Sequence, residues 1–508
     1  MSSIKVVVLA LFLLLCQVAL PQTGNVMLSA NVTHSFNDKY HISDHVSISY
    51  LRNYCSISTT NRVFFYPNKD TLSDSFFFSF NVSETRFYDL QIENYSIRLY
   101  LTPGDSLHGK IDLDNGQANF TGKGKDANNY LAGKYFNKGT SVNRFMAHRK
   151  EYKKLSPPDF YQLCDSIYQT WDYGFRSFPG ELFKEKFGEY AKNDILYELA
   201  NEQYSYLKTH FKERMLAGEP IGPDSSYYWF LGNAKTAASA GLDASFYNEL
   251  RQNLAVTVNN AKAVNSGYYF RFLDNYINDL MPEYAADKHW KIKGLENQYL
   301  HQYRLAKEHF NGKVADVLLG RILVNAFASQ QENTMLMDSL MTDYGNHTTD
   351  TLCLNTVKAK FQEYLKLVKG APAPNFNFTD IHGKQKSLAV YKGKVVYIMV
   401  LSSFNIPSMN VMNLLAGLQE HYDHKEVVLL YVSLDTKKEE WEKNVKTYHI
   451  AGEQYLPALV GKQNEFSELY NVRNLPQCIL IDKEGRIVST NAPNPAQGIE
   501  GVMDELLK

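Results

Sequence analysis

The sequence predicts a multidomain protein with an N-terminal β-sandwich, a central all-α region and a C-terminal α/β domain. Three changes of pattern support this division. Apolar residues alternate with polar ones up to about residue 124, and they then recur with the helical period up to about residue 368. Beyond that point strands and helices alternate. We therefore expect a leader at 1–24 and domains at 25–125, 126–368 and 369–508.

The composition is that of a folded globular protein. The chain has 508 residues, too many for one compact core, and 44% of them are hydrophobic and 21% charged. A net charge of −1 gives no electrostatic reason to expect nucleic acid or an anionic membrane as the main partner. No motif predicts a cofactor. No metal site is predicted either, because His41 and His45 would lie about 13 Å apart on a strand.

The N-terminus has the features of an export signal. Lys5 precedes an apolar run at 6–15, which is shorter than the roughly 20 residues that span a bilayer. No other segment is long enough for a transmembrane span. A lipid anchor at Cys16 is an alternative, but lipoprotein signals usually place a small residue before the cysteine, and Leu15 stands there. Cleavage between Ala19 and Gly24 is favoured. We expect an exported protein of the periplasm or cell envelope.

The N-terminal domain shows the period of two that is typical of half-buried strands. The run at 95–101 alternates apolar and polar residues before Pro103-Gly104 ends the strand. Asn115-Gly116 predicts a hairpin turn between strands at 110–113 and 117–120. Several short antiparallel strands with one polar face predict a small β-sandwich.

The central region is predicted to be helical. Pro157-Pro158, Pro282 and Gly312 are interpreted as helix boundaries. Cys164 lies on the apolar face of one of these helices and is predicted to be a small core residue. No fixed repeat is apparent, and nothing in this region specifies an activity. Its expected role is spacing or partner binding.

The C-terminal region has an α/β pattern. Lys369–Pro374 is interpreted as a stiff linker. Apolar strands are expected at 394–400 and 427–434, with a helix at 409–422 between them. A final hairpin at 478–489 is expected to turn at Glu484-Gly485.

Several short motifs in this region carry a resemblance when taken in order. They are Ala373–Phe376, Asp380–Gly383, Tyr391–Val396, Trp441 after Val432–Asp435, and Asn474–Gly485. With these motifs, residues 370–508 resemble the TlpA/ResA-type thioredoxin family of exported bacterial proteins, which implies a thioredoxin-like fold. The N-terminal β-sandwich also resembles the β-domain that precedes such domains in some exported proteins.

The resemblance implies a degenerate active site. Phe404–Ser408 stands where the family carries Trp-Cys-x-Pro-Cys, so Asn405 and Ser408 replace both cysteines. A carboxamide does not ionise to a nucleophile and a hydroxyl forms no disulfide. The family often has a carboxylate three residues further on, and Val411 stands there. No catalytic residue is therefore predicted in this loop.

The same positions have structural roles that the sequence itself suggests. Asn405 is a favoured N-cap, and Pro407 in the first helical turn costs no hydrogen bond. Pro476 stands at the position of the family's cis-proline, where relatives dock extended peptides. The resemblance thus implies a peptide-binding surface that consists of Phe404, Asn405, Pro407, Leu475 and Pro476.

The sequence is consistent with three functions. The leading hypothesis is a redox-inactive envelope protein that acts in peptide or protein binding or in assembly. One alternative is a divergent thiol-disulfide oxidoreductase or peroxidase of the TlpA/ResA type that uses a lone thiol. Cys478 is the candidate, although a buried core thiol is the favoured interpretation. The second alternative is a glycan-associated accessory protein, because the chain has 35 Tyr and 29 Phe and the β-domain is aromatic.

Overall fold

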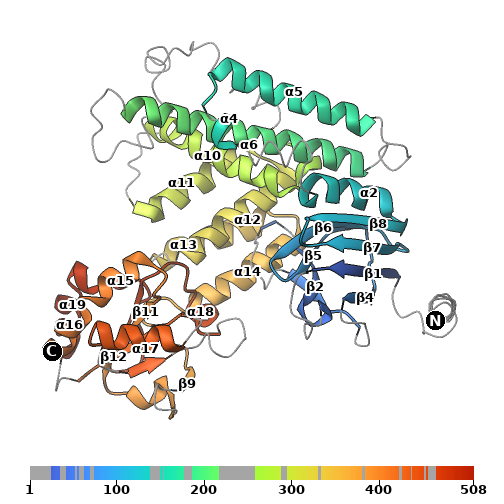
Figure 1. The fold of residues 1–508 in the computed structure, drawn as a ribbon. Coiled ribbons are helices and arrows are strands. Elements are labelled where there is room, and N and C mark those ends of the chain that lie inside the picture. Colours follow the sequence, from blue (N-terminus) through green and yellow to red (C-terminus); the bar gives the residue numbers. More distant parts are fainter. Residues whose placement is uncertain are drawn as a thin grey trace, which may run out of the picture. The chain divides into compact units, whose positions relative to one another are not determined.

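The computed structural model describes most of the chain after residue 24 (Figure 1). The described residues are 25–34, 42–51, 54–55, 62–68, 74–137, 149–152, 154–176, 186–216, 258–287, 294–329, 333–379, 384–422, 426–435, 438–450, 453–455 and 465–508. The predicted leader, with Cys16, and His41 lie outside these ranges, as does the His45 side chain. None of the helices described in these ranges is both long and apolar enough to cross a membrane.

Contacts group the chain into two compact units. The first comprises Met1–Trp290 and Leu305–Leu318, and the second comprises Lys291–Arg304 and Leu319–Lys508. The multidomain architecture and its order are confirmed: a strand-rich region comes first, a helical region follows, and a C-terminal domain is built on a mixed sheet. The domain boundaries drawn from composition stay predictions.

The N-terminal region is a β-sandwich of two four-stranded sheets, with orders β4-β1-β7-β8 and β3-β2-β5-β6. All its pairs are antiparallel except β1 with β7. Alternate apolar side chains of both sheets form one core, as the period of two predicts. The strands are β1 (Val26–Thr33), β2 (Val46–Leu51), β3 (Arg62–Phe65), β4 (Ser75–Phe80), β5 (Arg86–Ile92), β6 (Tyr95–Leu101), β7 (Ser106–Asp112) and β8 (Gln117–Lys123), with the short helix η1 (Ile42–His45) before β2.

Two adjacent asparagines of α2 (Lys125–Leu131) close the edges of both sheets. Asn128 accepts the Tyr100 amide at 2.8 Å and donates to the Tyr100 carbonyl at 3.0 Å on edge strand β6. Asn129 does the same for Phe120 on edge strand β8, at 2.6 Å and 2.8 Å. Each side-chain amide takes the place of a paired strand for one residue, so the backbone groups of Tyr100 and Phe120 are hydrogen-bonded at the two edges.

The turn that leads into α2 requires glycine at two positions. Gly122 and Gly124 have φ values of +96° and +93°. A Cβ on Gly122 would overlap the Ser106 carbonyl, and one on Gly124 would overlap the buried Asp105 side chain. Only glycine fits this close approach without strain.

The helices of the first unit follow the sandwich. A π-helical turn, η3 (Ala132–Phe136), continues α2. Cys164 is buried on α5, as predicted. Pro282 was wrongly interpreted as a boundary, because it lies inside α10, in its last two turns, where the missing amide removes a single hydrogen bond. The remaining helices are α4 (Arg149–Tyr152), α5 (Pro157–Arg176), α6 (Lys186–Leu216), η5 (Ala261–Ala263) and α10 (Gly267–Asp287).

Four helices come next in the sequence: α11 (Gly294–His309), α12 (Gly312–Ala328), α13 (Thr334–His347) and α14 (Thr351–Leu365). Residues of α11 and α12 are divided between the two units, whereas α13 and α14 belong to the second. Gly312 begins α12 with a φ of +53°, in agreement with the prediction of a boundary there. The side chains of Asn333 and Asp350 cap the first turns of α13 and α14.

The C-terminal domain is a five-stranded sheet of order β13-β12-β11-β14-β15 with helices around it. The strands β11, β12 and β13 are parallel to one another, whereas β14 is antiparallel to both of its neighbours, β11 and β15. The two central strands are buried along nearly their whole length, as their apolar runs predict. The elements are β9 (Asn377–Thr379), β10 (Gln385–Ser387), η6 (Leu388–Tyr391), β11 (Val395–Leu401), α15 (Ile406–Met412), α16 (Leu415–Tyr422), β12 (Val427–Ser433), α17 (Lys438–Thr447), β13 (Glu453–Tyr455), α18 (Glu465–Leu469), β14 (Gln477–Ile481), β15 (Ile487–Ser489), η8 (Pro495–Gln497) and α19 (Ile499–Leu507).

The predicted linker is part of this domain, which corrects the sequence-based interpretation. Gly370 donates its amide to the Ile487 carbonyl, and Pro372 forms a β-bridge with Arg486. Leu367, just before it, packs into the core on one face of the sheet. An extended X-Pro segment has the backbone shape of an edge strand, so the sequence features that indicated a spacer suit a sheet edge equally well.

Candidate functional site

Asn405 is the N-cap of α15, as predicted. Its side-chain oxygen accepts a hydrogen bond from the Ser408 amide at 2.8 Å and another from the Ser408 hydroxyl at 2.9 Å. Pro407 lies in the first turn, where its missing amide hydrogen costs nothing. The two side chains that the resemblance aligns with the cysteine pair are therefore bonded to each other, and both stabilise the helix start.

The predicted cis-proline faces the same edge of the sheet. The Leu475-Pro476 peptide bond is cis, which confirms that prediction. Strand β14 pairs with β11 so that Gln477 lies opposite Val400. The register therefore brings Pro476 beside the end of β11, where the chain turns toward α15. Leu475 and Pro476 are both half-buried.

A buried carboxylate braces the loop between β11 and α15. Asp435 follows β12 and is fully buried. Its Oδ1 accepts hydrogen bonds from the Ser402 hydroxyl at 3.0 Å, the Ser403 amide at 2.8 Å and the Ser403 hydroxyl at 2.7 Å. Its Oδ2 accepts the Ser433 hydroxyl at 2.8 Å. These donors replace the water that burial removes, and they tie the loop to the end of the neighbouring strand.

Sequence reasoning missed this role of Asp435. Val432–Asp435 contributed only to the resemblance. A usable signal was present, because Ser402-Ser403 follows one buried strand and Asp435 follows its parallel neighbour. The carboxyl ends of adjacent parallel strands meet at one sheet edge, so these polar groups had to lie close together.

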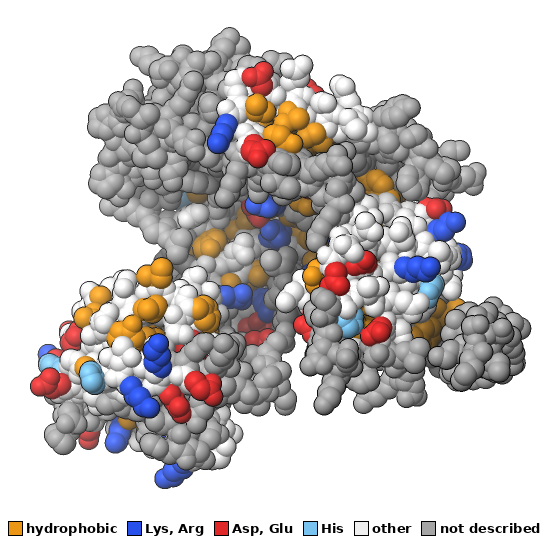
Figure 2. Space-filling model, viewed as in Figure 1, with side chains coloured by type: hydrophobic (Ala, Val, Ile, Leu, Met, Phe, Trp, Pro, Cys, Tyr) orange, Lys and Arg blue, Asp and Glu red, His pale blue; other side chains and the backbone are white. Residues whose placement is uncertain are grey.

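The start of α15 presents an apolar surface. Phe404 and Ile406 are each 73% exposed, and Met409 is 37% exposed. Figure 2 shows hydrophobic side chains gathered over the part of the C-terminal unit where Figure 1 labels α15. The segment 403–413 contains no charged residue. Hence no basic side chain within this segment is available to stabilise a thiolate.

Cys478 lies in the core, which confirms its predicted burial. It is 3% exposed on β14 and pairs with Met399 of β11. Burial raises the pKa of its thiol to about 11, although a hydrogen bond with Tyr397 acts in the opposite direction. A thiol of this kind is almost entirely protonated at neutral pH, and only the thiolate is a good nucleophile.

The other potential reactive groups do not assemble into a site. The four cysteines in the described ranges, Cys55, Cys164, Cys353 and Cys478, are all buried and form no disulfide with one another. Within the same ranges, no group of three or more His, Cys, Asp or Glu side chains could hold a metal ion.

Comparison with known proteins agrees with this fold. A family model described as thioredoxin-like matches residues 393–487. The chain is 30% identical over 128 residues to the thiol-disulfide oxidoreductase ResA of Bacillus cereus, a match that covers 25% of this chain and 72% of ResA. It is 28% identical over 127 residues to ResA of Geobacillus kaustophilus, covering 25% and 71%. The chain belongs, through its C-terminal quarter, to the ResA-type thioredoxin-like family.

A solved structure gives a similar match. The thioredoxin domain of a thiol-disulfide oxidoreductase from Bacteroides vulgatus is 23% identical, with 28% of this chain and 98% of that domain covered and a TM-score of 0.25.

Proposed function

We propose that the C-terminal domain is a redox-inactive docking module for peptides or proteins, in an exported protein of the periplasm or cell envelope. The main support is that Asn405 and Ser408 supply no sulfur and bond to each other at the helix start. Neither side chain is available for thiol-disulfide exchange. The localisation rests on the signal-like residues 1–24.

The exposed side chains around the cap give the surface its binding character. Phe404 and Ile406 are large, apolar and mostly exposed, and large exposed apolar groups are characteristic of binding sites. Pro476 lies at the same sheet edge. A partner that buries these groups gains hydrophobic free energy and needs no covalent step.

Bracing by Asp435 is compatible with binding. Its hydrogen bonds to Ser402 and Ser403 hold the loop in one conformation without a disulfide. A preorganised loop loses less conformational entropy when a partner binds. The surface is therefore expected to have the same shape under oxidising and reducing conditions.

A divergent oxidoreductase is the second candidate, because the named relatives are thiol-disulfide oxidoreductases. It would have to use a lone thiol such as Cys478. Burial and the raised pKa of Cys478 make that thiol a poor nucleophile. The glycan-binding alternative stays a prediction. Many aromatic side chains of the β-sandwich lie in its core, whereas Phe64 and Tyr66 are exposed by 38% and 71%.

Peptide display tests the docking proposal. The full-length protein is panned against a library of unstructured ten-residue peptides, and the affinity of a selected peptide is measured by calorimetry. We expect the variant Phe404→Ser/Ile406→Ser to bind at least about tenfold more weakly, the loss of roughly 1.4 kcal/mol that burial of such side chains supplies. Val390→Ser removes a side chain that is 63% exposed elsewhere on the domain, and it serves as the matched control.

Thiol blocking separates the two candidate functions. The folded protein is treated with N-ethylmaleimide, which alkylates accessible thiols. Docking is expected to retain its affinity after this treatment and in Cys478→Ser. Binding that is lost in Cys478→Ser, or that is unchanged in Phe404→Ser/Ile406→Ser, would remove the support for this surface.

A further inference from the structure

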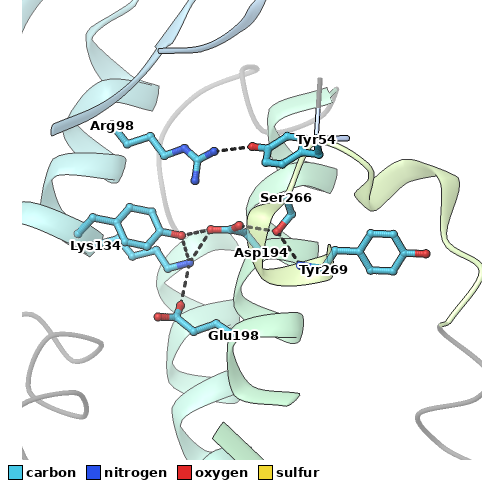
Figure 3. Close-up of polar contacts among 8 residues, drawn as sticks. Tyr54, Arg98, Lys134, Asp194, Glu198, Ser266 and Tyr269 are labelled. Atoms are coloured by element: carbon cyan, nitrogen blue, oxygen red, sulfur yellow. Dashed lines mark hydrogen bonds and ion pairs between the residues drawn. The ribbon is translucent and has the colours of Figure 1, made fainter. Parts of the chain in front are cut away.

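A buried cluster of charges lies in the first compact unit (Figure 3). Lys134 is on the π-helical turn η3, and Asp194 and Glu198 are one turn apart on α6. The Lys134 Nζ atom is 3.2 Å from Asp194 Oδ2 and 3.3 Å from Glu198 Oε2. These side chains are exposed by only 3%, 1% and 6%. One ammonium group therefore faces two carboxylates out of reach of water.

The two carboxylates are not equivalent. Asp194 accepts hydrogen bonds from the Ser266 hydroxyl at 2.8 Å and from the Tyr135 hydroxyl, in addition to its contact with Lys134. Glu198 accepts a hydrogen bond from the Tyr268 hydroxyl, and its Oε2 has only the ion pair with Lys134. A charge on Asp194 is therefore better compensated than a charge on Glu198.

The groups around Glu198 come from three elements. Lys134 faces it from η3, Asp194 from its own helix and Tyr268 from α10, while Arg98 of β6 acts on Asp194. Burial raises the pKa of Glu198, and the attraction of Lys134 does not cancel this effect. Burial opposes the charge of Lys134, but the two carboxylates outweigh it and raise the pKa of Lys134. Lys134 thus keeps its charge while Glu198 is the group that gains a proton readily.

The π-helical turn connects this cluster to the β-sandwich. Asn137, directly after η3, donates its amide to the Ala132 carbonyl at 2.7 Å. Its side-chain oxygen accepts the Ala118 amide of edge strand β8, also at 2.7 Å. A movement of η3 away from α6 is therefore expected to disturb this hydrogen bond at the sheet edge. π-Helical turns often occur where a helix has a functional role.

We propose that Glu198 is a proton-operated switch and that Asp194 is the fixed anion of this cluster. With Glu198 protonated, one ammonium faces one carboxylate. When Glu198 loses its proton, the buried site contains a second negative charge, and no additional hydrogen-bond donor compensates it. The contact between η3 and α6 then loosens, and the edge of β8 becomes accessible.

The sign of the pH dependence follows from linkage. A carboxyl group whose pKa is raised by folding makes its full contribution to stability when the pH is below its unfolded-state pKa of about 4.3. This contribution is lost as the pH rises through the folded pKa of Glu198. The cluster is therefore closed in acid and loosens toward neutral and alkaline pH.

Amide hydrogen exchange of Ala118 in the full-length protein measures this opening directly. After correction for the intrinsic exchange rate, its protection factor is expected to fall with rising pH, by up to about tenfold per pH unit where one proton is released. Glu198→Gln keeps the shape but cannot ionise, so its protection factor should be independent of pH. Glu189→Gln is the matched control on the same helix, because Glu189 forms an exposed ion pair with Lys262. It should keep the wild-type dependence.

A second variant assigns the role of Asp194. Ser266→Ala removes one hydrogen bond to Asp194 and should lower the protection of Ala118 at every pH without removing the pH dependence. The infrared difference spectrum of the wild type minus Glu198→Gln should contain a protonated carboxyl band at acid pH that weakens as the pH rises. A wild-type protection factor that does not change with pH, or a dependence that persists in Glu198→Gln, would overturn the proposal.

Discussion

Two buried aspartates, one in each compact unit, are used in different ways. Asp435 accepts hydrogen bonds from uncharged donors. Ser433 is at the end of its own strand, and Ser402, 33 positions earlier in the sequence, is in the loop after the adjacent strand. Asp194 accepts hydrogen bonds from Lys134 and Ser266, which are 60 and 72 positions away in the sequence. The first aspartate braces a local loop, whereas the second joins separate segments of the chain. Replacing Asp435 should therefore affect the structure locally, whereas replacing Asp194 should weaken contacts between distant segments of the chain.

The largest effect is expected from Lys134→Met. Removing the ammonium leaves Asp194 and Glu198 buried without a cation, which should cost about 3–5 kcal/mol of unfolding free energy. Urea denaturation of the full-length protein, followed by circular dichroism, measures this loss. Lys262→Met removes a lysine from the exposed pair with Glu189 and should cost no more than about 1 kcal/mol. Equal effects of the two substitutions would contradict the distinction between these ion pairs.

An intermediate effect is expected from Asp435→Ala. The Ser403 amide and the surrounding hydroxyls lose their acceptor in a buried site, which should cost about 3 kcal/mol. The loss should be confined to the C-terminal unit, and Trp441 reports it because this side chain is fully buried there. Fluorescence is read in a background with the other tryptophans replaced by phenylalanine. Circular dichroism follows the helices of the first unit, and an equal shift of their transition would show that the brace is not local.

A smaller effect is expected from Asn129→Ala. The Phe120 amide and carbonyl on edge strand β8 lose their side-chain partner, at a cost of about 2 kcal/mol. Asn119→Ala on the same strand removes an exposed side chain and serves as the control. Size-exclusion chromatography should also detect association of Asn129→Ala through the unprotected edge. An unchanged midpoint and an unchanged monomer fraction would show that this amide pair is dispensable.

Local sequence signals predicted the C-terminal site well. Asn405 as a cap, the buried strands and the burial of Cys478 all follow from residue type and spacing. The cis form of Pro476 followed from the family resemblance. Features that depend on distant partners could not be predicted in this way. Nothing in the neighbourhood of Lys134 in the sequence indicates two carboxylates on α6.

The errors have the same origin. Pro282 and the segment Lys369–Pro374 were interpreted from their local composition alone. Packing allows a proline late in a helix, and pairing with the 485–487 turn converts an apparent linker into a sheet edge. A fragment that starts at Gly370 keeps this pairing but loses Leu367 from the core. Separate folding of such a fragment remains a prediction.

Disulfide reduction by the purified protein tests the central claim most directly. The assay follows dithiothreitol-dependent reduction of insulin. The wild-type protein is expected to add nothing to the rate with dithiothreitol alone, because Asn405 and Ser408 provide no dithiol. The variant Asn405→Cys/Ser408→Cys should form a disulfide within α15's first turn and show a modest rate. Wild-type turnover that disappears in Cys478→Ser would contradict the account.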